Sequence, residues 1–140
     1  SSGTHYWEIK IEKFVELDDI IIGVAKEGGP EVKIFDTGKF YGWICTGGRK
    51  IYPTQPGGGP IAKEYGGCAK IGDTIGCLLE FKNNTGYLTF LKNGNPLGVC
   101  FNNIPPGSYF PTAVMYYGEV QITLDSKARL NTNKFGGSKK

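Results

Sequence analysis

The sequence predicts an all-β protein, folded as an antiparallel sandwich or barrel with little or no helix. Gly and Pro are dense, with 22 Gly and 8 Pro among 140 residues. An interior Gly costs a helix about 1 kcal/mol and an interior Pro about 3 kcal/mol. The apolar segments between them are short, and several alternate apolar with polar residues, as half-buried strands do. With 39% hydrophobic and 13% aromatic residues, the chain can build a core, which excludes disorder.

The strands are predicted from apolar periodicity. Residues 5–14 alternate, with Trp7, Ile9 and Ile11 on one face. Residues 20–25 form a continuous apolar run that Gly23 interrupts, which is typical of a central strand that approaches another backbone closely. Later strands are expected at residues 40–46, 49–52, 74–82, 87–92, 96–101, 109–117 and 119–125. The chain should therefore contain about eight or nine short strands.

Turn residues separate these strands. Gly47-Gly48 is expected to turn the chain into the strand at 49–52, and residues 53–60 to form a loop. Residues 83–86 join the clearest hairpin. Asn93-Gly94 favours positive φ at both central positions of a two-residue turn. Connections this short favour antiparallel neighbours.

The positive charge is concentrated at the C-terminus. The formal net charge is +3, but residues 1–124 carry 11 basic and 12 acidic side chains. A basic stripe for phosphate backbones is therefore not expected, which argues against a nucleic-acid reader. We expect residues 1–125 to form one domain and residues 126–140 a basic, frayed tail. A nucleic-acid role through that tail stays open, and deleting residues 126–140 would test it.

No metal, cofactor or membrane site is expected. Cys45, Cys68, Cys77 and Cys100 include no Cys-x-x-Cys pair, and His5 is the only histidine, so common zinc spacings are missing. Reduced thiols are favoured because a domain of this size needs no disulfides, although two disulfides would fit a secreted chain. No apolar run is long enough to span a membrane.

Several short motifs follow one another along the chain. They read Tyr6-Trp7-Glu8-Ile9, Ile22-Gly23-Val24-Ala25, Gly72-Asp73-Thr74-Ile75-Gly76, Gly86-Tyr87-Leu88-Thr89-Phe90, Asn93-Gly94, Leu97-Gly98-Val99-Cys100-Phe101 and Tyr109-Phe110-Pro111. This order resembles the SPRY domain from about residue 4 to 125. The resemblance implies a jelly-roll-like sandwich of two curved antiparallel sheets. Glu80 departs from the Asp that many members carry, and the chain starts without the upstream strands that many relatives use to close the sandwich.

The resemblance also implies a function. SPRY domains are binding modules, so we expect a non-catalytic, monomeric domain whose loops grip a short peptide or a protein surface. Such domains act as adaptors or ubiquitin-ligase substrate receptors within larger proteins, here expected to be intracellular and cytoplasmic. Aromatic and Arg side chains are favoured interface anchors. By position in the family pattern and by residue type, the expected partner-binding residues are Tyr117, Tyr116, Arg49 and Tyr52, with Phe35 and Tyr65 as loop candidates.

Two other classes of function compete with this interpretation. An enzyme is not favoured, because a catalytic triad needs a histidine and His5 lies in the first strand beside the terminus. A lectin-like sandwich that binds carbohydrate through aromatic and polar loop residues is the better alternative. That alternative predicts a secreted, disulfide-bonded chain, so titration of free thiols would separate the two.

Overall fold

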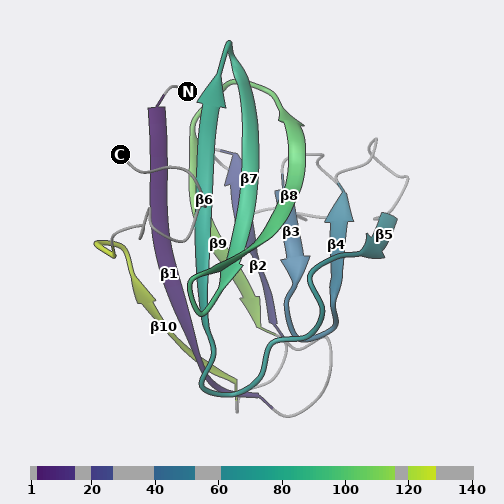
Figure 1. Ribbon diagram of the computed structural model, residues 1–140, viewed down its shortest axis with the longest axis vertical. Coiled ribbons are helices and arrows are strands. Elements are labelled where there is room, and N and C mark those ends of the chain that lie inside the picture. The colour runs from purple at the N-terminus through teal and green to yellow at the C-terminus, as the bar shows by residue number, and fades with distance from the viewer. Residues whose placement is uncertain (1–2, 15–19, 27–39, 53–60, 116–119, 129–140) are drawn as a thin grey trace. The chain divides into compact units, whose positions relative to one another are not determined.

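The protein is all-β in the parts that its computed structural model describes, which are residues 3–14, 20–26, 40–52, 61–115 and 120–128. These residues form ten β-strands in two five-stranded antiparallel sheets and contain no helix (Figure 1). The predicted class, an antiparallel all-β protein, is confirmed. The chain divides into two compact units, and each unit holds one of the sheets.

One sheet, the β1 sheet, has the strand order β10-β1-β6-β7-β8. Its strands are β1 (Gly3–Lys13), β6 (Thr74–Lys82), β7 (Thr85–Lys92), β8 (Asn95–Ile104) and β10 (Gln121–Asp125). Trp7 lies opposite Cys77, which lies opposite Phe90, and all three are buried. Ile9 and Ile11 are buried as well, so the predicted apolar face of the first strand is confirmed.

The turns of the β1 sheet have the backbone geometry that their sequence favours. Asn83 and Asn84 between β6 and β7 have φ of 53° and 64°, and Asn93 and Gly94 between β7 and β8 have φ of 53° and 87°. Asn and Gly are the residues that tolerate positive φ best. The predicted hairpin at 83–86 and the predicted Asn-Gly turn are both confirmed.

The other sheet, the β2 sheet, has the order β5-β4-β3-β2-β9. Its strands are β2 (Ile20–Lys26), β3 (Phe40–Ile44), β4 (Arg49–Tyr52), β5 (Ile61–Glu64) and β9 (Tyr109–Met115). One face carries a buried cluster that consists of Ile21, Ala25, Phe40, Ile44 and Ile51. At Gly23, a Cβ atom would strike the carbonyl oxygen of Tyr41 and the Cα of Gly42 on β3. The predicted close backbone approach at Gly23 is therefore confirmed.

Several boundaries differ from those expected. Strand β5 (Ile61–Glu64) was not predicted, β3 ends at Ile44 instead of residue 46, and β10 begins at Gln121 instead of residue 119. The end of the strand predicted at 109–117 and the loop predicted at 53–60 lie outside the described residues. Residues 116–119 and 129–140 lie outside the described residues. The division into one domain over 1–125 and a tail over 126–140 stays a prediction. Within the described ranges, no helix is long and apolar enough to cross a membrane.

Candidate functional site

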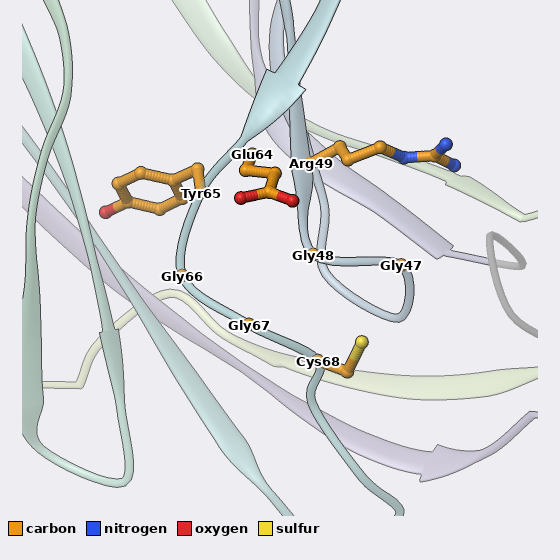
Figure 2. Close-up of a pocket in the computed structure, with 8 residues that line it drawn as sticks. All are labelled: Gly47, Gly48, Arg49, Glu64, Tyr65, Gly66, Gly67 and Cys68. Carbon is orange, nitrogen blue, oxygen red and sulfur yellow. The ribbon is translucent and has the colours of Figure 1, made fainter.

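An open pocket of about 710 Å³ lies at the end of the β4–β5 hairpin, within the β2 sheet's own unit. We call it the hairpin pocket (Figure 2). It is lined by Gly47, Gly48, Arg49, Glu64, Tyr65, Gly66, Gly67 and Cys68. The first three come from the turn between β3 and β4 and from the start of β4, and the others from the end of β5 and the segment after it.

Two glycine-containing segments approach each other to form the floor of the hairpin pocket. Gly48 has a φ of 76°, and a Cβ at this position would lie 3.2 Å from the backbone carbonyl of Gly67. The carbonyl oxygen of Gly48 also accepts a hydrogen bond from the Tyr65 backbone N–H at 2.9 Å. A Cβ at Gly48 would crowd the Gly67 carbonyl, and the positive φ of Gly48 also favours glycine, so main chain forms this part of the floor.

Backbone hydrogen bonds fix the β3–β4 turn. The N–H groups of Gly47 and Gly48 both donate to the Ile44 carbonyl, at 3.0 and 2.8 Å. The Ala69 N–H donates to the Cys45 carbonyl at 2.6 Å, which ties the segment after β5 to the end of β3. Both segments that line the pocket are thus anchored to the same strand end.

Tyr65 is held by contacts to its backbone and to its ring. The Trp43 indole N–H donates to the Tyr65 carbonyl at 3.0 Å, and the two rings meet edge to face with centroids 5.6 Å apart. The Lys50 Nζ lies 6.0 Å from the centroid of the Tyr65 ring, within cation–π range. Since Trp43 is completely buried, Tyr65 is fixed to the core of its sheet while it stays partly exposed.

Arg49, Glu64 and Cys68 supply the polar side chains of the pocket. Arg49 and Glu64 are register neighbours across β4 and β5. Figure 2 shows the Tyr65 ring and the Arg49 guanidinium pointing in opposite directions, with the Glu64 carboxylate between them. The Cys68 thiol is exposed and turns toward the Gly47–Gly48 turn. The pocket therefore offers an aromatic ring, a guanidinium, a carboxylate and a thiol.

The structure brings two of the six predicted site residues together. Arg49 and Tyr65 both line the hairpin pocket. Tyr52 lies on β4 opposite Ile61, at the other end of the strand pairing from Arg49. Its side chain, and the residues Phe35, Tyr116 and Tyr117, lie outside the described residues.

Sequence reasoning did not predict six of the eight lining residues as site residues. They are Gly47, Gly48, Glu64, Gly66, Gly67 and Cys68. The adjacent glycines directly after Tyr65 were the available signal, because such a pair marks a place where backbones can come close.

The shifted tyrosine pKa values belong to residues outside the pocket. Burial raises the pKa of Tyr109 to about 12, with a contribution from nearby Tyr41, whose pKa burial also raises. The two rings meet edge to face with centroids 6.4 Å apart. Burial, and then a 2.7 Å hydrogen bond to the Glu8 carboxylate, raise the pKa of Tyr6. These groups favour their neutral forms and so serve the scaffold.

Neither a metal cluster nor a disulfide occurs in the described part of the chain. No three His, Cys, Asp or Glu side chains gather there as metal ligands. All four cysteines are free thiols, with Cys45, Cys77 and Cys100 buried and only Cys68 exposed. The Cys45 thiol donates to the Ile20 carbonyl at 3.7 Å.

Comparison with known proteins identifies the family. The model of the SPRY domain family matches residues 4–127. The chain belongs to the SPRY domain family. The SPRY domain of human HERC1 superimposes with a TM-score of 0.71 at 18% identity, covering 91% of this chain and 78% of that one. The recognition of the family and the predicted class of jelly-roll-like β-sandwich are thereby confirmed.

The relatives are much longer proteins. Ran-binding protein 9 of Danio rerio is 30% identical over 119 residues, which cover 84% of this chain and 19% of the relative. F-box/SPRY domain-containing protein 1 of Anopheles gambiae is 36% identical over 55 residues, which cover 39% of this chain and 20% of the relative. The chain thus spans about a fifth of the length of Ran-binding protein 9. SPRY domains are protein-interaction modules, which confirms the general class of the predicted function.

Proposed function

We propose that this SPRY domain binds a short peptide or a protein surface through the hairpin pocket, without catalysis, as an adaptor or substrate-recognition domain of a larger intracellular protein. The observation that carries the proposal is the meeting of Arg49 and Tyr65 in one pocket. Arg49 was expected to bind a partner from its residue type and its place in the family pattern, and Tyr65 was expected to do so as a loop candidate. A ubiquitin-ligase role, a cytoplasmic location and a monomeric state belong to the same proposal.

Preorganisation of Tyr65 favours recognition of a partner. Its carbonyl, its N–H and its ring make contacts to Trp43, Gly48 and Lys50. An anchor that is already fixed loses little side-chain entropy on binding, so more of the contact energy appears as affinity. Tyr and Arg are also the residue types most often found among energetically dominant interface contacts.

The exposed thiol of Cys68 provides a direct test. Because the other three cysteines are buried, N-ethylmaleimide should label Cys68 alone in the folded protein. Peptides selected from a displayed random library should slow this labelling, and the Cys68→Ser variant should still bind them. Peptides that bind tightly but leave the labelling rate unchanged would place the binding site away from the hairpin pocket.

Substitution of Arg49, another residue that lines the hairpin pocket, tests the same site. Arg49→Ala should weaken binding of a selected peptide by about 1–2 kcal/mol, the range of a significant interface contact. Lys82→Ala is the matched control, since Lys82 is exposed, lies in the β1 sheet and also stands over a tyrosine ring, at 5.7 Å from Tyr87. Equal losses in both variants would contradict a specific role for Arg49.

The site is proposed to extend to Tyr117, Tyr116, Tyr52 and Phe35. Tyr117→Ala is expected to lower peptide affinity by about 1–2 kcal/mol and to leave the melting temperature nearly unchanged. If this variant unfolds, Tyr117 belongs to the core and the extended site is misplaced. The lectin-like alternative is tested by titrating thiols in the denatured, unreduced protein, where four reactive thiols argue against it.

A further inference from the structure

Three consecutive residues on one side of the hairpin pocket have main-chain groups that no other part of the described chain uses. They are Gly66, Gly67 and Cys68, which we call the 66–68 stretch, and Figure 2 shows them following Tyr65 along the pocket. None of their N–H and carbonyl groups forms a hydrogen bond with another described residue. All three residues are partly or fully exposed, so these groups are accessible to a partner.

The two ends of the 66–68 stretch are fixed by hydrogen bonds. Before it, the Tyr65 N–H donates to the Gly48 carbonyl, and the Tyr65 carbonyl accepts the Trp43 indole N–H. After it, the Ala69 N–H donates to the Cys45 carbonyl. The unused main-chain groups therefore lie between two anchored positions. A partner that binds them has little backbone entropy to remove from the stretch.

The lining of the pocket combines hydrogen-bond donors and acceptors without net charge. The 66–68 stretch contributes N–H and carbonyl groups, although the Gly67 carbonyl lies against the Gly48 backbone. The Glu64 carboxylate adds an acceptor that has neither a hydrogen bond nor an ion pair to another described residue. The formal charges of Glu64 and Arg49, the two charged lining residues, cancel. A peptide main chain also alternates donors and acceptors without charge, so it complements this lining.

We propose that the hairpin pocket recognises an extended peptide segment through its main chain, which forms hydrogen bonds with the 66–68 stretch while one of its side chains contacts the Tyr65 ring. This inference rests on the proposed function and decides between its two kinds of partner. Most main-chain groups of a folded surface already have partners, whereas those of an extended segment are free to pair. The partner is therefore a linear segment without proline at the contacting positions, because proline lacks the N–H donor.

A purely structural role for the glycines makes a different prediction. Gly66 and Gly67 both have a φ of 74°, which glycine adopts without strain. If the two glycines serve only to direct the chain from β5 toward Ala69, a bound peptide will be recognised by its side chains alone. Changes to the main chain of that peptide will then leave its affinity unaltered.

The experiment replaces single amides by esters in a peptide that was selected on the unaltered protein from a displayed random library. An ester removes one N–H donor, weakens one carbonyl acceptor and keeps every side chain. Two or three neighbouring ester positions should each weaken binding about twofold to tenfold, the loss of one hydrogen bond. Alanine at the same positions should have smaller effects, except where the side chain contacts Tyr65. Unchanged affinity for every ester would overturn the proposal.

The variant Gly67→Asn tests the contact from the side of the protein, with Gly72→Asn as its matched control. Gly67 and Gly72 have φ of 74° and 96°, and Asn tolerates positive φ better than most residues. A Cβ at either position would meet no atom within 4 Å beyond its chain neighbours. Only Gly67 lines the pocket, since Gly72 precedes β6 of the other sheet.

Gly67→Asn should weaken binding of the selected peptide about tenfold, the loss of two hydrogen bonds, because the new side chain obstructs the 66–68 stretch. Gly72→Asn should bind the peptide as the unaltered protein does, and thermal melting should show that both variants fold. Equal weakening in the two variants, or full affinity in Gly67→Asn, would contradict main-chain recognition. The ester series uses the unaltered protein and decides the question if Gly67→Asn folds poorly.

The outcomes also separate this inference from the proposed function. Selected peptides that protect Cys68 from alkylation but tolerate every ester would overturn main-chain recognition and leave the pocket as a peptide site. If no selected peptide protects Cys68 or responds to Arg49→Ala, both the inference and the proposed function fail. Cys68→Ser should keep its affinity for the peptide, because the inference uses only the main chain of this residue.

Discussion

Replacing Asn93 by alanine should lower the free energy of unfolding by about 2–5 kcal/mol at neutral pH. The Asn93 side chain connects two turns of the β1 sheet. Its amide N–H donates to the Asp73 carboxylate at 2.9 Å, and its amide oxygen accepts the Thr74 backbone N–H at 2.9 Å. Asp73 in turn accepts the Lys70 backbone N–H at 2.8 Å. The substitution therefore breaks a network that joins the start of β6 to the β7–β8 turn.

The magnitude follows from two separate losses. Each lost hydrogen bond costs about 0.5–1.5 kcal/mol, and the bond to the carboxylate lies at the upper end of that range. Asn93 also has a φ of 53°, and alanine is strained in this left-handed region by about 1–2 kcal/mol. Asn93→Gly separates the two terms, because glycine accepts positive φ but makes neither side-chain bond. It should therefore cost less than Asn93→Ala.

The same network predicts a dependence on pH. Burial alone would raise the pKa of Asp73, but the Asn93 amide, the Lys70 N–H and the charges of Lys92 and Lys70 outweigh burial and hold the pKa below its ordinary value of 3.8. A folded-state pKa below the unfolded one means that this stabilisation is present above about pH 4 and is lost as the pH falls through the folded-state value. Asn93→Ala removes a cause of the lowered pKa, so its deficit in stability should shrink in acid.

Urea denaturation followed by tryptophan fluorescence, at neutral pH and near pH 3, measures all of these effects. The expected order of stability at neutral pH is unaltered protein, then Asn93→Gly, then Asn93→Ala. A loss below about 0.5 kcal/mol for Asn93→Ala would show that water replaces the network without cost. A larger loss in Asn93→Gly than in Asn93→Ala would refute the backbone part of the reasoning.

Three further predictions concern the scaffold. Gly23→Ala should destabilise the protein far more than Gly76→Ala. At Gly23 the new Cβ would strike a backbone carbonyl, whereas at Gly76 it would meet a tyrosine side chain that can rotate away. Thermal melting of both variants checks this order. Trp7→Ala should cost about 3–5 kcal/mol in urea denaturation, since Trp7 is only 5% exposed. For Tyr109, whose pKa is raised from 10.0 to about 12 in the folded state, the neutral form stabilises the fold below pH 10. Stability should therefore fall as the pH rises from 10 toward 12, and Tyr109→Phe should reduce this fall.

Local chemistry explains what could be predicted from the sequence. The turn at Asn93-Gly94 was predictable because positive φ depends on the turn residues themselves. The apolar face of β1 was predictable because alternation reports which side chains share a face. The close approach at Gly23 was predictable because a residue without a Cβ stands in a strand whose other side chains are bulky.

Strand β5 could not be predicted because its structure depends on a distant partner. Ile61-Ala62-Lys63-Glu64 is a short segment without a strong β pattern, and its pairing with β4 fixes it as a strand. Sequence-based reasoning finds strands by their own periodicity, so a strand that exists through pairing alone is missed.

The candidate site was predictable in its side chains and not in its shape. Arg49 was selected by residue type and family position and Tyr65 as a loop candidate, and both line the pocket. The floor depends on the approach of Gly48 to Gly67, which the sequence separates widely and only the folded sheet brings together. The place of Cys68 in the pocket follows from the same fold.

The position of Tyr65 shows how the core of the β2 sheet fixes part of the candidate site. Trp43 fills the interior of its sheet with its ring and uses its only polar atom to hold the Tyr65 carbonyl. A buried indole needs a hydrogen-bond acceptor in any case, so the same bond satisfies the core and fixes the first residue after β5. The neighbouring side chains of Glu64 and Cys68 do not have to provide a hydrogen-bond acceptor for the buried indole. They can therefore change with little effect on folding. The core therefore fixes the position of Tyr65 in the pocket, whereas Glu64 and Cys68 line the pocket without taking part in that contact.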